Sequence, residues 1–199
     1  MPSNLSRRFV LTAAAAAALA PALPAQALTT SQASALIDRV IADINAVINS
    51  GKSEAVMIRE FERIFTTYAD VPIIARSALG VAARSASSAQ LNRFTEAFRG
   101  YMARKYGKRF REFIGGRLEV KGAKPVKSFY EVKTTAFLQG HSPFEVTFLV
   151  SDKSGRDLFF NMLIEGVNML ATERTEIGAM LDRNRGNVDA LISDLQSAG

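Results

Sequence analysis

Hydrophobic residues recur at helical spacing through the first half of the chain beyond residue 28. A repeat of three to four residues predicts amphipathic helices, each with one apolar face. Four such helices are expected, at residues 31–49, 53–68, 70–80 and 87–114. Ser53 is a candidate N-cap of the second helix, and Pro72 suits the first turn of the third. Ser87 and Gln90 form a capping box that marks the start of the longest one.

Beyond Gly116 apolar and polar residues alternate, which predicts β-strands. Four strands are expected, near residues 118–122, 130–138, 144–150 and 158–164. In the last of them, Leu158, Phe160, Met162 and Ile164 are predicted to share one face. The connections between the last three strands are short, and only antiparallel neighbours can be joined in that way.

A last helical region, at about residues 168–196, follows the strands and is interrupted at 184–186. The predicted fold class is α+β. In this fold, N-terminal helices pack on a curved four-stranded antiparallel meander, and a C-terminal helix closes the structure.

The first 27 residues have the features of an export signal. Arg7 and Arg8 precede an apolar stretch, and Ala25 to Ala27 provide the small residues of a cleavage site. The segment around the arginines resembles a twin-arginine signal, and an ordinary secretory signal is the alternative. Both predict a periplasmic protein, with residues 28–199 as a single domain.

The composition argues against several classes of chemistry. Two of the 25 Lys and Arg residues, Arg7 and Arg8, lie in the expected signal, so the remaining chain has 23 against 19 Asp and Glu. This mildly basic balance favours anionic lipid surfaces or acidic partners over nucleic acid. Cysteine is absent from the sequence, and His141 is its one histidine. A metal site or a serine triad would need more ligands or bases than this, so we expect no metal, no cofactor and no enzymatic activity.

The long helix has an unusually aromatic face. Its candidate functional residues are Phe94, Phe98, Tyr101, Met102 and Tyr106. Such a stripe usually forms solid core, and the residues alone favour that interpretation over a ligand cavity.

The opposite side of the same helix carries Arg104, Lys108 and Arg111. These side chains are predicted to form a solvated face. A docking surface for anionic lipid or for an acidic partner is the alternative.

Two motifs resemble those of a known family. Leu79-Gly80 is followed by Gln90, Phe94 and Phe98 at four-residue spacing, and the segment 164–167 is followed by Arg174. Together they resemble the toluene-tolerance or MlaC group of periplasmic phospholipid-binding proteins, over residues 30 to 196. The chain departs from the group's usual pattern at three places, Asp157, Phe160-Asn161 and Glu173.

The resemblance implies an apolar cavity between the concave face of the sheet and the helices. Acyl chains would lie inside, with the head group near solvent. The implied lining residues are Phe94, Phe98, Tyr101, Met102, Tyr106, Val132, Phe144, Val146, Phe148, Phe160, Met162 and Ile164.

The resemblance also implies a role in lipid transport that maintains outer-membrane lipid asymmetry. The protein would be a monomer that carries a phospholipid between an outer-membrane lipoprotein complex and an inner-membrane ABC lipid transporter. A hopanoid or another lipid is an alternative cargo. An alternative function is that of a periplasmic adaptor whose apolar groove takes a protein partner.

Overall fold

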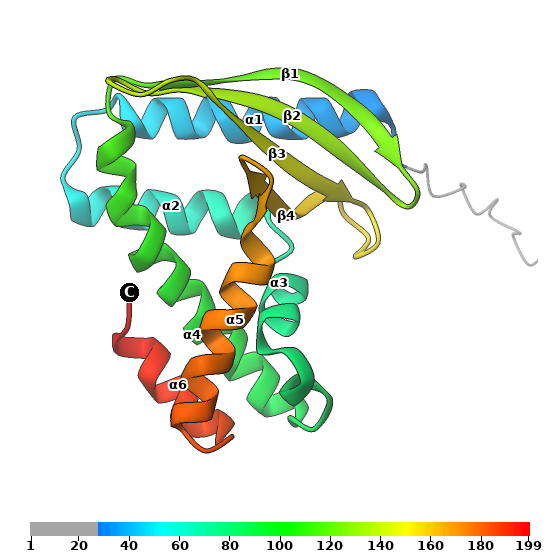
Figure 1. Ribbon diagram of the computed structural model, residues 1–199, viewed down its shortest axis with the longest axis vertical. Helices are drawn as coiled ribbons and strands as arrows, with labels where there is room; N and C mark the ends of the chain where they lie inside the picture. Colours follow the sequence, from blue (N-terminus) through cyan, green and yellow to red (C-terminus); the bar gives the residue numbers. More distant parts are fainter. Residues whose placement is uncertain (1–27) are drawn as a thin grey trace, which may run out of the picture.

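The chain forms an elongated molecule with a sheet at one end and helices at the other (Figure 1). The structure is a computed structural model and describes residues 28–199, so the expected export signal lies outside the described residues. The helices are α1 (Thr30–Ile48), α2 (Glu54–Tyr68), α3 (Val71–Leu79), α4 (Ser88–Gly107), α5 (Met169–Arg183) and α6 (Val188–Ser197). The predicted helices and the predicted break before the last one are confirmed. Two 3₁₀ turns, Gly80–Arg84 and Lys108–Phe113, continue α3 and α4.

The sheet is an antiparallel meander in the order β1-β2-β3-β4-β5. Its strands are β1 (Arg117–Val126), β2 (Phe129–Phe137), β3 (Phe144–Ser151), β4 (Leu158–Ile164) and β5 (Val167–Asn168). The fifth strand was not predicted, because two residues are too few to show an alternating pattern. It pairs with β4 across Glu165 and Gly166, whose positive φ angles of 49° and 78° suit a tight hairpin turn.

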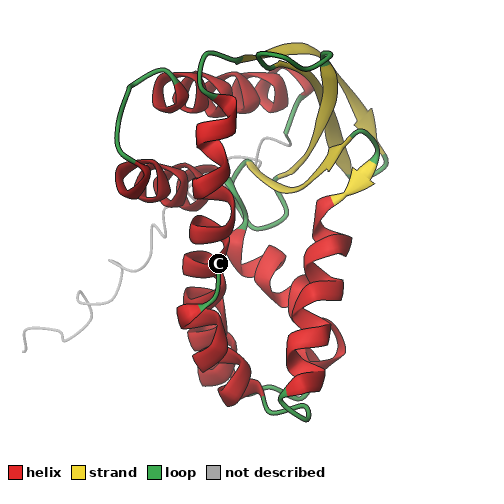
Figure 2. Ribbon diagram, turned by 60° about the vertical axis from the view of Figure 1, so that its left-hand side comes forward, coloured by secondary structure: helices red, strands yellow, loops and turns green. Residues whose placement is uncertain are grey.

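Two register shifts, one between Val120 and Gly122 and one between β3 and β4, accompany the curvature of the sheet seen in Figure 2. The second corrects a prediction. Phe160 is the extra residue there, so Phe159 instead packs inward on Phe148, with ring centroids 5.5 Å apart. Phe160 contacts Phe129 on the outer face, at 5.7 Å. The expectation that Phe160 shares the inner face with Met162 is therefore wrong.

We call β1–β5 with α1 and α2 the sheet end, and α3, α5, α6 and the first half of α4 the helical end (Figure 1). Helix α1 packs on β1, and α2 packs on α4, the helix that connects the helical end to the sheet end. The close approach of α2 and α4 depends on Gly107, because a Cβ there would lie 2.7 Å from the Ile58 Cα. One continuous hydrophobic core joins both ends.

Helix caps explain most of the observed boundaries. The predicted capping box of Ser87 and Gln90 is present, and a second one, made by Thr29 and Gln32, starts α1. Asp70 caps α3 by accepting a hydrogen bond from the Ile73 amide. Ser53 is the N-cap residue of α2, as predicted, although its hydroxyl makes no capping hydrogen bond.

Candidate functional site

The inner face of the sheet is apolar, and it is more open at one end than in the middle. Val132, Val146 and Phe148 are buried there, as predicted for inward-facing residues. Thr134 is also buried on this face, and its hydroxyl donates a hydrogen bond to the Val146 carbonyl at 2.7 Å. This bond removes the cost of burying a lone polar group.

The open part of this face lies toward β5 and the start of α5. Phe144, Met162 and Ile164 are only half-buried, although each packs against the core. Ile164 pairs with Val146, and Met162 pairs with Phe148, so the half-buried side chains adjoin the closed middle of the face. We call Phe144, Met162 and Ile164 the open edge of the inner face.

The aromatic face of α4 is divided between the two ends of the molecule. Phe94 and Phe98 are fully buried and stack on one another, with ring centroids 5.8 Å apart. They belong to the half of α4 that Figure 1 shows far from the sheet. Tyr101 and Met102 are also buried, whereas Tyr106, in the last turn, is half-buried and stacks on Phe61 of α2 at 6.2 Å. The structure therefore brings the end of α4, but not its first half, toward the sheet end.

A polar cluster joins the end of α4 to α5. The buried carboxylate of Glu173 accepts hydrogen bonds from Lys105 Nζ, at 2.8 Å, and from the Tyr106 hydroxyl. Lys105 also contacts Glu176, which accepts a further hydrogen bond from the Tyr101 hydroxyl at 2.6 Å. Sequence analysis identified the two tyrosines as lining candidates but missed this cluster, because the burial of Glu173 and the pairing of both glutamates with Lys105 arise only in three dimensions.

The cluster shifts the pKa values of its members. Burial raises the pKa values of Tyr101 and Tyr106 well above their usual range, and hydrogen bonds to Glu176 and Glu173 add to the effect. Burial opposes the charge of Lys105, but its hydrogen bonds to the two carboxylates outweigh that penalty and raise its pKa. At neutral pH both phenols therefore stay protonated as donors, and Lys105 stays charged.

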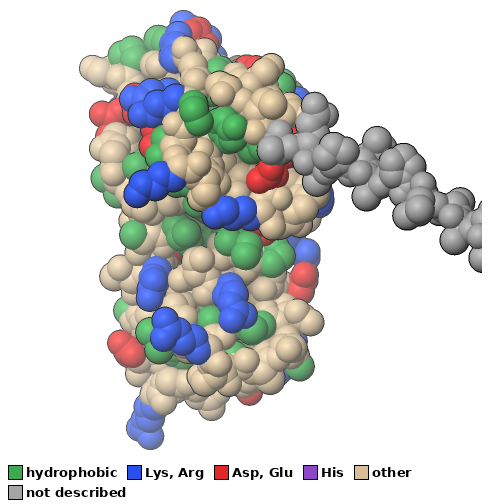
Figure 3. Space-filling model, turned by 90° about the vertical axis from the view of Figure 1, so that its right-hand side faces the viewer, with side chains coloured by type: hydrophobic (Ala, Val, Ile, Leu, Met, Phe, Trp, Pro, Cys, Tyr) green, Lys and Arg blue, Asp and Glu red, His purple; other side chains and the backbone are tan. Residues whose placement is uncertain are grey.

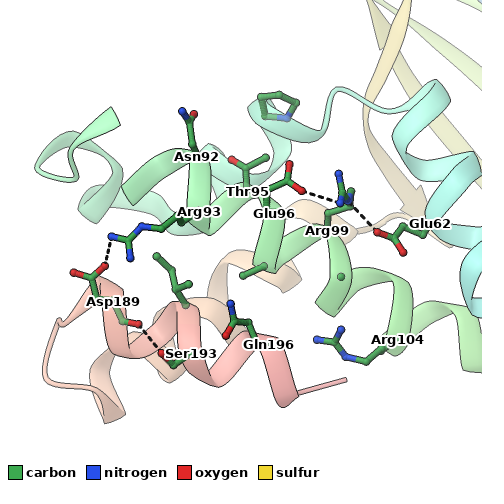
Figure 4. Close-up of a pocket in the computed structure, with 14 residues that line it drawn as sticks. Glu62, Asn92, Arg93, Thr95, Glu96, Arg99, Arg104, Asp189, Ser193 and Gln196 are labelled. Atoms are coloured by element: carbon green, nitrogen blue, oxygen red, sulfur yellow. Dashed lines mark hydrogen bonds and ion pairs between the residues drawn. The ribbon is translucent and has the colours of Figure 1, made fainter. Parts of the chain in front are cut away.

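Two surface hollows lie on other parts of the molecule. A groove of about 950 Å³ runs between α4 and α6 (Figure 4). Its walls carry ion pairs between Arg93 and Asp189 and between Arg99 and the carboxylates of Glu62 and Glu96. A hollow of about 420 Å³ lies beside it and is lined by residues of α2 and by Arg99. None of the twelve predicted lining residues borders either hollow, so the predicted apolar cavity is neither of these.

The predicted basic face of α4 is not simply solvated. Arg104 Nε donates to the Ala198 carbonyl at 2.7 Å, and Lys108 Nζ donates to the Gly199 carbonyl at 2.7 Å. Arg111 lies 3.5 Å from a carboxylate oxygen of Glu54. Lys108 and Arg111 are exposed, as predicted for a solvated face, and Arg104 is half-buried. Arg104 and Lys108 in addition hold the C-terminal residues against the end of α4.

Basic side chains are spread over the face in Figure 3, with hydrophobic side chains between them. Within residues 28–199, no group of three or more His, Cys, Asp or Glu residues is placed to hold a metal ion. In the same part of the chain, no helix combines the length and the hydropathy that a membrane crossing requires. His141 is exposed in the loop after β2.

Comparison with known proteins bears on this architecture. A family model described as MlaC protein matches residues 34–197 of the chain. The structure is also similar to that of a phospholipid-binding protein from Ralstonia solanacearum, solved in complex with a phospholipid, with a TM-score of 0.70. The two sequences are 17% identical, and the match covers 82% of this chain and 94% of the other. At this level of identity the likeness shows a shared fold.

Proposed function

Because the chain belongs to the MlaC family, as its motifs predict, we propose that it is a carrier that binds the acyl chains of a phospholipid or a related lipid. One observation carries the proposal. The apolar inner face of the curved sheet has an open edge, where Phe144, Met162 and Ile164 remain half-buried. A site for acyl chains requires large apolar side chains that the fold leaves partly uncovered in this way.

In this proposal the acyl chains enter at the open edge and lie along the inner face, against Val146 and Phe148. Tyr106 and Phe61 would contact them from the helices. Phe94 and Phe98, which pack in the helical end, would stabilise the fold rather than touch the lipid. Phe160, on the outer face, would also lie away from the acyl chains.

The energetics explain why such a shield is needed. Exposing hydrocarbon to water costs about 0.8 kcal/mol per methylene, so a lipid with two chains faces a barrier on the order of 20 kcal/mol if it crosses alone. An apolar site removes most of this barrier. The lipid must also leave the site, so we expect few polar bonds to the head group and a direction of transfer set by partner complexes.

We place this activity in the periplasm, with residues 1–27 as an export signal that is removed. The partners of the proposed monomer are an inner-membrane ABC lipid transporter and an outer-membrane lipoprotein complex. These expectations come from the family resemblance and from the sequence of the signal, and export can be tested by cell fractionation and N-terminal sequencing.

The proposed role is one of binding, without catalysis. Replacing His141 with alanine should therefore leave lipid binding and transfer unchanged. The second candidate function is an adaptor that uses the open edge as a groove for a partner helix. The same half-buried residues would serve it, so the two functions differ in what occupies the edge.

The deciding experiment is to purify the exported protein and identify what it carries. Native mass spectrometry followed by extraction with organic solvent should reveal about one lipid per chain. A ligand-free protein that also takes up no lipid from vesicles would overturn the proposal. If such a protein binds a peptide instead, the adaptor is favoured.

A further inference from the structure

Two asparagine side chains join the sheet to the start of α5. Asn161, in β4, is 8% exposed, and its Nδ2 donates a hydrogen bond to Asn168 Oδ1 at 2.9 Å. The Asn161 Oδ1 accepts hydrogen bonds from the Met162 amide at 2.8 Å and from the Leu170 amide at 3.1 Å. Asn168 is the N-cap residue of α5, and its Oδ1 also accepts from the Ala171 amide at 3.0 Å. We call Asn161 and Asn168 the asparagine pair.

The asparagine pair caps α5 from two different elements. The first amides of an α-helix have no acceptor within the helix, so nearby side chains usually satisfy them. Here the Ala171 amide bonds to the N-cap residue of α5 itself, whereas the Leu170 amide bonds to a residue of β4. Hydrogen bonds have a defined distance and direction, which apolar packing lacks. The pair therefore fixes the position of the first turn of α5 relative to the sheet.

The asparagine pair lies beside the open edge but on the other face of the sheet. Asn161 pairs with Leu149, and Asn168 pairs with Leu163, so both belong to the outer face. Met162, the next residue after Asn161, faces inward and is part of the open edge. Figure 1 shows α5 leaving the sheet directly after β4. The pair can thus hold α5 at the open edge without occupying the path proposed for the acyl chains.

The inner face behind the open edge is closed in this structure. Val146 and Phe148 are only 6% and 3% exposed. Neither of the two surface hollows is lined by a residue of the open edge. Because a packed interior has no spare volume, acyl chains can reach these side chains only if the sheet and the helices part there. A movement that separates the start of α5 from β4 must break the bonds of the asparagine pair.

We infer that the asparagine pair restrains the opening of the lipid site and so limits the rate at which a lipid enters and leaves. Asn161 and Asn168 are positioning residues, since they act through α5 and lie away from the acyl chains. The inference rests on the proposed lipid-binding function and adds a control of the transfer rate to it. Such a restraint keeps the lipid shielded while the carrier crosses water.

The test follows the release of one fluorescent lipid. The purified exported protein is loaded with a phosphatidylethanolamine that carries a fluorophore on one acyl chain, and its transfer to phosphatidylcholine vesicles is recorded by fluorescence. Asn161→Leu keeps the size of the side chain but removes its donor and its acceptor. This variant should raise the rate constant of release about fivefold, the factor that corresponds to one hydrogen bond.

A second substitution tests whether the two asparagines act together. Asn168→Ala removes the partner of Asn161 and should also accelerate release several-fold. The double variant, Asn161→Leu with Asn168→Ala, should release lipid little faster than Asn161→Leu alone. Residues that share one hydrogen-bond network show such non-additive effects.

Asn184→Leu is the matched control, at the opposite end of α5. The Asn184 Nδ2 donates to the Met180 carbonyl at 3.0 Å and to Asp194 Oδ2 at 2.6 Å. This variant also loses polar bonds of the same helix, but its release rate should equal that of the unaltered protein. Asn161→Asp is the conservative variant, because a carboxylate still accepts from the Leu170 amide and is favourable at a helix N-terminus. Its release rate should stay within about twofold of the unaltered protein.

The outcomes separate this inference from the proposed function. Equal release rates of Asn161→Leu and the unaltered protein overturn the inference and leave lipid binding standing. An equal acceleration in Asn184→Leu also overturns it, because the effect would then follow from a general weakening of α5. If Asn161→Leu does not fold, as judged by circular dichroism, Asn168→Ala decides by the same criteria, since Asn168 is exposed. An unaltered protein that takes up no labelled lipid overturns the proposed function itself.

Discussion

The two ends of the molecule bury aromatic and aliphatic residues in different ways. At the helical end, Phe94 and Phe98 are fully enclosed, and the surface above them carries exposed ion pairs such as Arg93 with Asp189. At the sheet end, the open edge leaves apolar side chains half-buried although they contact the core. Phe94 and Phe98 are therefore placed to stabilise the fold, whereas Phe144, Met162 and Ile164 leave part of their apolar surface uncovered. Burial, rather than residue type, distinguishes structural positions from candidate binding positions.

The largest expected effect is a loss of stability at the helical end. Phe98→Ala removes a fully buried ring and should lower the free energy of unfolding by about 3 to 5 kcal/mol. Denaturant unfolding measures the loss. Lipid bound per folded molecule should stay close to that of the unaltered protein. A strong loss of lipid with little change in stability would instead place Phe98 in the binding site.

The next prediction tests the sheet end. Ile164→Trp adds bulk at the open edge and should reduce co-purified lipid several-fold, because the larger ring occupies the path of the acyl chains. The half-buried position should limit the change in stability to about 1.5 kcal/mol. Leu163→Trp is the matched control, since Leu163 is also half-buried but pairs with Thr147 and points to the opposite face. Equal lipid loss in both variants would argue against a site on the inner face.

The polar cluster between the two ends predicts a change in stability at alkaline pH. The pKa of Tyr106 is raised in the folded protein from an ordinary value of 10.0, so the folded state holds this proton more tightly than the unfolded chain does. Its contribution to stability is complete below pH 10 and is lost as the pH rises above that value. Tyr101 and Lys105 shift in the same direction.

Unfolding in denaturant between pH 8 and pH 11 measures this effect. The free energy of unfolding should decline above pH 10, and Tyr106→Phe should make the decline shallower without removing it, since Tyr101 and Lys105 remain. Tyr130→Phe is a suitable control, because the Tyr130 hydroxyl donates to the Leu28 carbonyl and touches neither carboxylate. The interpretation fails if both variants show the same pH dependence as the unaltered protein.

The sequence predicts the elements of this fold better than it predicts their contacts. Helix starts follow from local chemistry, as at Ser87 and Gln90, where a side chain bonds the backbone three residues away. The shift in β4 depends on how two strands pair, so alternation alone put Phe160 on the wrong face. The different burial of Phe98 and Tyr106 depends on which neighbouring elements each part of α4 contacts. The burial of Glu173 depends on contact between α4 and α5, two helices that are far apart in the sequence.

The smallest expected effect concerns the surface of the helical end. Arg93 and Asp189 form an ion pair at 2.6 Å, but their side chains are 58% and 52% exposed. Water and salt screen such a pair, so Arg93→Ala should change the free energy of unfolding by less than about 1 kcal/mol, with an even smaller effect at high salt. The Arg93→Ala variant keeps the hydrogen bond between Gln90 and Asp189, at 3.0 Å, which still links α4 and α6. A loss of several kcal/mol in denaturant unfolding would mean that the groove between these helices contributes to the fold as strongly as the buried rings beneath it.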